Sequence, residues 1–224
     1  MLKDKYRLVW ATFFAIAFIS VTIMITSTFT EPPTKDRSAS QEHMILWFYF
    51  TFQSNLIGMI TAGIITFFKV DREKPWVQRL KICMVINLTI TMIVFWTIIF
   101  RNPSKYTAFT FVSTILVHAV NPIMALIAFC WDVYKEDYAI KVNVKTTSLL
   151  IIYPMVWLII AVILYYAIND GEHGAIYSFL AFEERPVWLV VLMVFGIGLS
   201  YAGFNFAFTK FLMNRSINIF KKAA

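Results

Sequence analysis

Two groups of polar residues interrupt long apolar segments of this chain. His118 lies near the middle of the apolar segment 106–130, and the sequence TFQSN at 51–55 lies inside the apolar segment 44–68. A polar or ionisable side chain at the depth of a bilayer's hydrocarbon core is expensive, and such residues usually face a bundle interior and mark a functional site. The first question for function is therefore whether these two places meet.

Three of the polar side chains in segment 51–55 share one face of a helix. Thr51, Ser54 and Asn55 are spaced i, i+3 and i+4, which places them on the same side, whereas Gln53 falls on another side. By helix rise, Thr51 lies about 10 Å below the outer end of its segment and His118 about 18 Å below the outer end of its own. These depths are compatible with contact between the two.

His118 has a polar neighbour and a helix breaker on its own segment. Asn121 follows at i+3 on the same face, and Pro122 removes a main-chain hydrogen bond near His118. A carbonyl freed in this way needs a partner, which a nearby polar side chain can supply.

A pocket between the two faces would contain the groups of an acyl-transfer site. Thr51 would be the nucleophile and His118 the general base. Further hydroxyl and amide groups would bind substrate or stabilise an oxyanion: Ser54, Asn55, Asn121 and Gln53. Two alternatives stay open. Ser54 is a second candidate nucleophile, and the whole group can instead serve packing, since span threonines bond to their own helix and amides join neighbouring helices.

Several other chemistries are excluded by the residue types. The apolar segments hold no Gly-rich phosphate loop, no carboxylate pair and no row of charges, which argues against an ATPase, a carboxylate proton pump and a voltage sensor. Metal binding needs more than one ligand at the depth of His118, so we expect no metal and no cofactor.

The composition is that of a membrane protein. Of the 224 residues 59% are hydrophobic and 15% are charged, and the mean hydropathy is +0.69, more apolar surface than a soluble domain can bury. The net charge is +7, but the basic residues are spread between the apolar segments and form no separate face. We therefore expect membrane lipids as partners and no nucleic acid.

Six apolar segments are long enough to cross a bilayer as helices. Of the 20 lysines and arginines, 15 fall on the side of the N-terminus and 5 on the other, which predicts that both termini are cytoplasmic. The fold class is thus an all-α, polytopic, multi-pass protein of the cell membrane, with one domain over residues 1–224. The predicted spans are 8–29, 44–68, 80–100, 106–130, 147–168 and 187–208.

Two connecting regions carry their own expectations. Lys81 is counted among the cytoplasmic charges, and residues 132–137, with Asp132 and Lys135, are expected to form a solvated cytoplasmic turn. The outer segment 171–186 has an apolar centre, so it either dips into the membrane interface as a lid or packs on the bundle as an ordinary loop.

Four short motifs resemble those of a family of uncharacterised bacterial six-helix membrane proteins. The family has Tyr-Phe-Thr-x-x-Ser-Asn in its second span, matched at 49–55, and His-x-x-x-Pro in its fourth, matched at 118–122. It also has a Tyr-Pro pair in its fifth span, matched at Tyr153-Pro154. Its last outer loop has Tyr-Pro-Phe-Leu, matched at 177–180 with serine in place of the proline. The resemblance extends from residue 49 to the last span.

That bacterial family is distantly similar to the androgen-induced and androgen-dependent TFPI-regulating protein family. The members of this second family are membrane threonine hydrolases, which cleave fatty acid esters of hydroxy fatty acids with an intramembrane threonine and histidine. The resemblance implies that Thr51 and His118 are the corresponding residues here.

The sequence thus leads to a hydrolase of lipid or fatty-acid esters with a Thr51/His118 dyad, which acyl chains enter sideways from the bilayer. The alternative is a non-catalytic membrane protein that binds or moves a small hydrophobic ligand, or a partner-binding membrane subunit. The substrate and the oligomeric state cannot be inferred from the sequence.

Overall fold

The structure, a computed structural model, is helical, with no strand in the part of the chain that it describes. The described part comprises residues 2–30, 39–68, 70–71, 74–100, 107–135 and 152–168, and separate positions between 186 and 211. The prediction of an all-α protein is confirmed for these residues.

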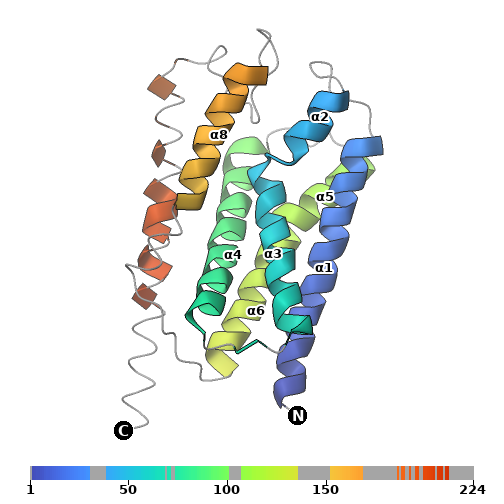
Figure 1. The fold of residues 1–224 in the computed structure, drawn as a ribbon, viewed down its shortest axis with the longest axis vertical. Helices are drawn as coiled ribbons and strands as arrows, with labels where there is room; N and C mark the ends of the chain where they lie inside the picture. Colours follow the sequence, from blue (N-terminus) through green and yellow to red (C-terminus); the bar gives the residue numbers. More distant parts are fainter. Residues whose placement is uncertain are drawn as a thin grey trace.

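Long helical rods stand side by side and a short helix lies at one end of the bundle (Figure 1). Two of the rods contain a π-helical turn, in which main-chain hydrogen bonds span five residues instead of four. In chain order the elements are α1 (Leu2–Thr30), the short α2 (Ala39–Leu46), α3 (Phe50–Phe67), α4 (Pro75–Val94) continued by the π-helical turn η1 (Phe95–Ile99), then α5 (Ala108–Ile115), the π-helical turn η3 (Leu116–Val120) and α6 (Asn121–Lys135) as one rod, and α8 (Ile152–Ile168).

Within the described residues, four helices are long and apolar enough to cross a membrane: Lys5–Thr30, Phe50–Phe67, Pro75–Ile99 and Ala108–Asp132. They correspond to the first four predicted spans. The apolar part of α8, Ile152–Leu164, is shorter, and the sixth predicted span falls on positions that are described only in part. The helices therefore indicate a membrane protein by their length and composition.

The second predicted span, 44–68, differs from the structure because the chain bends within it. α2 ends at Leu46, Tyr49 is extended with φ −62° and ψ 124°, and α3 begins at Phe50. The bend exposes two main-chain carbonyls, and side chains take both. Gln53 Nε2 donates to the Trp47 carbonyl at 2.9 Å, and Trp157 Nε1 of α8 donates to the Phe48 carbonyl at 2.7 Å. We call residues 47–49 the elbow.

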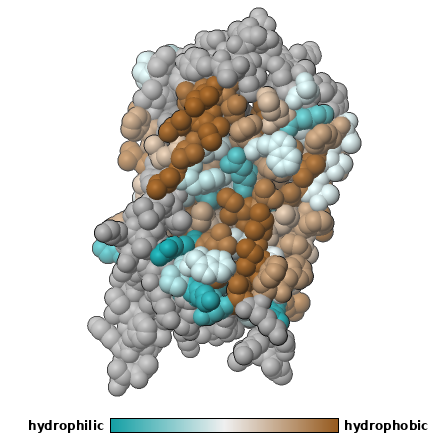
Figure 2. All heavy atoms as spheres, viewed as in Figure 1, coloured by the Kyte–Doolittle hydropathy of each residue, from teal (hydrophilic) through white to brown (hydrophobic). Residues whose placement is uncertain are grey.

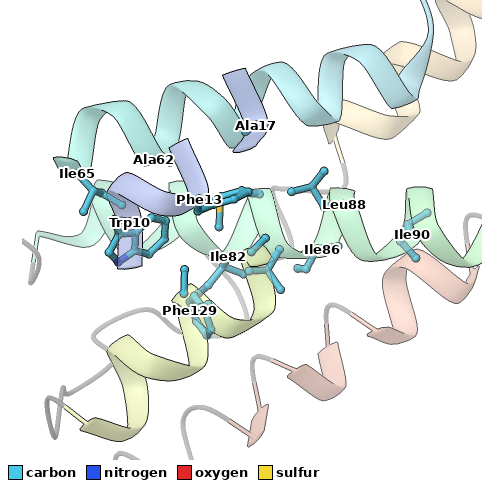
Figure 3. Packing of buried hydrophobic residues seen from close by; sticks show 14 of the residues in the cluster. Trp10, Phe13, Ala17, Ala62, Ile65, Ile82, Ile86, Leu88, Ile90 and Phe129 are labelled. Atoms are coloured by element: carbon cyan, nitrogen blue, oxygen red, sulfur yellow. The ribbon is translucent and has the colours of Figure 1, made fainter. Parts of the chain in front are cut away.

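The apolar core fills the seam between α1, α3, α4 and α6. In Figure 3, side chains from all four helices converge on it, among them Phe13 of α1, Leu88 of α4 and Phe129 of α6. α3 approaches closely at Gly58, where a Cβ atom would lie 3.1 Å from Leu88 Cδ1 and 3.4 Å from Phe13 Cζ. This close approach holds the polar residues of α3 against their neighbours.

Large apolar side chains are also exposed along the outside of the helices. Phe18, Ile60, Ile123 and Ile159 are examples from α1, α3, α6 and α8, and brown apolar atoms cover much of the described surface between the two ends in Figure 2. Exposed large apolar side chains on several helices are unsuited to water and fit contact with acyl chains.

One expectation about charge is wrong. Asp132 is not part of a solvated turn, and Lys81 is not a surface charge, because both side chains are buried, with exposures of 0% and 1%. They form an ion pair between α6 and α4. Lys81 Nζ also donates to the Tyr6 hydroxyl at 3.2 Å and lies 5.4 Å from the ring centroid of Trp10. We call these four residues the ion-pair cluster.

Two further expectations lie outside the described residues. They are the form of the outer segment 171–186, with its motif at 177–180, and the start of the fifth predicted span at residue 147.

Candidate functional site

The π-helical turn η3 lies directly before Asn121 and Pro122, the first residues of α6. The Asn121 N–H bonds to the Leu116 carbonyl, five residues back, and Pro122 has no N–H to offer the carbonyls that follow. Two side chains from other helices take these carbonyls. Asn55 Nδ2 of α3 donates to the Val117 carbonyl at 3.3 Å, and Trp96 Nε1 donates to the His118 carbonyl at 3.0 Å. The expectation that polar side chains satisfy the carbonyls freed by Pro122 is confirmed.

A second π-helical turn, η1, packs against the first. The Phe100 N–H bonds to the Phe95 carbonyl at 2.8 Å, and the Phe95 ring stacks on the His118 imidazole with centroids 3.6 Å apart and planes 10° from parallel. Single π-helical turns occur frequently at functional sites. Here two of them, from neighbouring helices, meet at one histidine.

The His118 imidazole is buried, with 8% exposure, and one of its two nitrogens has a hydrogen-bond partner. The Thr91 carbonyl is hydrogen-bonded to the ring, whereas Nδ1 is buried and has no hydrogen-bond partner among the described residues. Because a carbonyl only accepts and Nδ1 has no partner among the described residues, we assign the contact with Thr91 to a protonated Nε2. A neutral imidazole in this tautomer has its lone pair on Nδ1, which is the form that a general base needs.

The two groups of polar residues found in the sequence contact each other through Asn55 and Asn121. Asn121 Nδ2 donates to Asn55 Oδ1 at 2.7 Å, and the Ser20 hydroxyl of α1 lies 3.3 Å from Asn121 Oδ1. Asn55 Nδ2 donates to the Thr51 carbonyl at 2.8 Å as well as to the Val117 carbonyl. Three helices are thus joined by one chain of buried hydrogen bonds, which we call the amide chain.

The two candidate nucleophiles lie one turn before Asn55 or beside it. Thr51 is 6% exposed and Ser54 is fully buried. Ser54 Oγ has no hydrogen-bond partner in the described part of the chain. Because His118 Nδ1 has none either, no hydrogen bond joins Thr51 to that nitrogen in this structure. The hydroxyl and the imidazole are therefore on facing segments without direct contact between the reacting atoms.

Gln53 points away from this cluster, toward α8. Its Oε1 accepts from the Tyr153 hydroxyl at 2.8 Å, while its Nε2 donates to the elbow. The motif at 49–55 therefore contacts the motif at 118–122 through Asn55 and the Tyr153-Pro154 motif through Gln53. Gln53 holds helices together rather than lining the cluster around His118.

Four residues around His118 and Asn121 were not predicted from the sequence: Ser20, Thr91, Phe95 and Trp96. Thr91 acts through its main-chain carbonyl, which any residue type provides. Trp96 lies near a predicted span end, where tryptophan is expected as an interface anchor. Their positions follow only from how the helices pack: α4 and η1 against η3, and α1 against Asn121.

In the described part of the chain, no group of three His, Cys, Asp or Glu side chains is placed to hold a metal ion. Comparisons with protein-family models, with curated proteins and with solved structures found no match to this chain. The functional argument therefore depends on the geometry around His118.

Proposed function

We propose that this protein is an intramembrane hydrolase of lipid or fatty-acid esters, with Thr51 as nucleophile and His118 as general base. The observation that carries the proposal is the state of His118. It is a buried imidazole whose Nε2 is held by the Thr91 carbonyl and whose Nδ1 is without a partner among the described residues. It sits on a segment that is hydrogen-bonded to the face of α3 that carries Thr51.

In the proposed reaction, Thr51 Oγ1 attacks the ester carbonyl carbon while His118 Nδ1 accepts the hydroxyl proton. The hydroxyl meets Nδ1 only when substrate is bound, since catalytic hydrogen bonds are often loose in the free enzyme. The imidazolium then gives its proton to the leaving alkoxide. Water, deprotonated by the same nitrogen, hydrolyses the acyl-threonine and regenerates the enzyme.

The remaining polar residues take different roles in this proposal. Ser54 donates a hydrogen bond from its hydroxyl to the oxyanion, because it is buried beside the nucleophile and has no other partner among the described residues. Asn55 already uses both amide hydrogens on main-chain carbonyls, so it positions the segment of His118. Asn121 has a second amide hydrogen and is the other oxyanion candidate.

The placement in the membrane is part of the proposal. Six spans put both termini in the cytoplasm of a multi-pass cell-membrane protein, and lipid esters enter from the bilayer. Supporting observations are the four membrane-length helices and their exposed apolar side chains. In a cysteine-free background, Lys222→Cys is expected to react with a membrane-impermeant maleimide only from the cytoplasmic side, and Lys35→Cys only from outside. The reverse pattern contradicts the orientation.

A fluorophosphonate probe and a panel of lipid esters test the catalytic proposal. Purified wild-type protein is expected to be labelled on Thr51, as located by peptide mass spectrometry, and to release fatty acid. Thr51→Ala and His118→Ala are expected to lose both activities. Thr97→Ala is the matched control, because Thr97 is exposed and bonds to its own helix at the Ile93 carbonyl.

The outcomes separate the candidate nucleophiles and the candidate functions. A label on Ser54 that survives in Thr51→Ala would make Ser54 the nucleophile. If neither Thr51→Ala nor His118→Ala changes the release of fatty acid from any ester, the hydrolase proposal fails.

A non-catalytic function is the second candidate, and the amide chain favours it. Its amides are spent on joining helices, as in a packing or recognition role. In that case the protein binds or moves a small hydrophobic ligand, or serves as a partner-binding membrane subunit. Saturable binding of an ester that is never hydrolysed would support this candidate.

A further inference from the structure

The face of η1 that meets His118 presents two consecutive aromatic residues. Phe95 covers the imidazole ring, and Trp96 donates its indole N–H to the main-chain carbonyl of the same histidine. Consecutive residues of a regular α-helix diverge by about 100°. The extra residue in the π-helical turn changes this register, so that both side chains reach one residue of the neighbouring helix.

Three contacts from this helix each restrict a different property of His118: its tautomer, the plane of its ring and the position of its main chain. The Thr91 carbonyl holds Nε2–H, which fixes the tautomer. The Phe95 ring lies parallel to the imidazole and covers one of its faces, which fixes the ring plane. The Trp96 indole fixes the main chain at the point where Pro122 interrupts the helix. Proton exchange is left to Nδ1.

We propose that Phe95 and Trp96 are positioning residues that hold the His118 ring against the Thr91 carbonyl, which keeps the Nε2–H tautomer and leaves Nδ1 as the proton acceptor. Their catalytic meaning depends on the proposed hydrolase function. The geometric claim does not, because it concerns the state of the imidazole in the protein without substrate.

Phe95 and Trp96 are distinct from ordinary packing residues in one measurable way. A residue that only fills space affects the stability of the fold, whereas a positioning residue also determines which ring nitrogen is protonated. The two neutral tautomers differ in the chemical shifts of their ring nitrogens. The state of His118 can therefore be read without any assay of activity.

The test is nitrogen NMR of protein labelled with ring-¹⁵N histidine in detergent micelles. The chain has only three histidines, and His118→Gln identifies the signals of His118. Wild-type protein is expected to show the Nε2–H tautomer alone. Phe95→Leu, which removes the stacked ring, and Trp96→Phe, which removes only the N–H, are each expected to show a mixture of both tautomers.

Two controls keep the spectrum interpretable. Phe95→Tyr keeps an aromatic ring over the imidazole and is expected to restore the single tautomer. Trp76→Phe removes an indole from the same helix at an exposed position and is expected to leave the spectrum unchanged. If Phe95→Leu and Trp96→Phe both retain the Nε2–H tautomer alone, the proposal is wrong.

Turnover measured on the same variants connects the geometry to the reaction. Trp96→Phe is expected to reduce kcat about fivefold, the factor that corresponds to one ordinary hydrogen bond, with KM unchanged. If neither Thr51→Ala nor His118→Ala changes turnover of any ester, the hydrolase proposal fails, while the tautomer result still decides the positioning claim.

Discussion

At the scale of single residues, Asn55 makes the contact that brings α3 to the segment of His118. Its side chain bonds to the Thr51 carbonyl, the Val117 carbonyl and the amide of Asn121. Asn55→Leu leaves the Val117 carbonyl and one amide hydrogen without partners in a buried place. We expect the free energy of unfolding to fall by about 2 kcal/mol.

Thermal unfolding in detergent measures this loss, with Thr97→Ala as the control for removing a polar group that bonds to its own helix. A variant Asn55→Leu as stable as Thr97→Ala would show that the amide chain does not hold the helices together. It would also remove the structural reason for placing Thr51 opposite His118.

Residues of the site differ in how far the sequence could predict them. Thr51, His118 and Asn121 stand out because polar side chains are rare in apolar segments of this length. Phe95 and Thr91 do not stand out, because one is apolar and the other contributes a main-chain atom. A contact made through a carbonyl has no signature in residue types, so this part of the site required the structure.

At the scale of elements, the π-helical turn η3 ends two residues before Pro122, and we expect this proline to maintain the turn. Pro122→Ala restores an N–H that can close an ordinary α-helical turn on the His118 carbonyl. Removing one residue from the turn rotates the two halves of the rod relative to each other by about 100°. The imidazole then leaves the Phe95 ring, and Nδ1 leaves the face that carries Thr51.

We therefore expect Pro122→Ala to have opposite effects on stability and turnover. Stability should be unchanged or higher, since a proline inside a helix costs about 3 kcal/mol, while kcat should fall at least about tenfold. Unfolding and ester hydrolysis are measured on the same preparation. Full turnover in a stabilised Pro122→Ala variant would exclude a catalytic role for the π-helical turn η3.

The elbow interrupts a segment, 44–68, that the sequence predicted as one continuous span. The residue types do not mark the bend, because it occurs among Trp47, Phe48 and Tyr49, which are apolar or aromatic and include no proline or glycine. The carbonyls that the bend exposes are satisfied by Gln53 and Trp157. A side chain 6 positions away and another on α8 thus permit a break that the apolar pattern conceals.

A double-mutant cycle tests whether Gln53 also couples the elbow to α8. Tyr153→Phe removes the hydroxyl that donates to Gln53, and Gln53→Leu removes its acceptor as well as the donor to Trp47. We expect a coupling energy of about 1 kcal/mol, in the range of hydrogen bonds between membrane helices. Additive effects of the two substitutions on unfolding would show that the hydrogen bond between Gln53 and Tyr153 does not couple the elbow to α8.

At the scale of the whole molecule, the group around His118 and the ion-pair cluster are two polar centres among the described residues, and they lie far apart along one rod. Asp132 lies 14 residues beyond His118 on the same rod, which corresponds to about 21 Å of helix. Core residues such as Ile82, Ile86 and Phe129 lie in the same seam. The sequence predicted the first centre from polar residues in apolar segments. It did not predict the second, because Lys81 and Asp132 lie near span ends where charges are normally solvated.

The ion-pair cluster yields the last prediction, which concerns stability without catalysis. Removing one partner of a buried ion pair lowers the free energy of unfolding by about 3–5 kcal/mol, because the other charge stays buried alone. Lys81→Met and Asp132→Leu are each expected to lose stability by this amount. The double variant is expected to regain most of it, since apolar side chains of similar volume often replace a buried pair without loss.

Unfolding of the three variants in detergent measures these changes in stability. Turnover of the double variant should equal that of the wild type, because the ion-pair cluster is far from His118. A double variant that folds stably but no longer hydrolyses ester would show instead that the two polar centres are coupled.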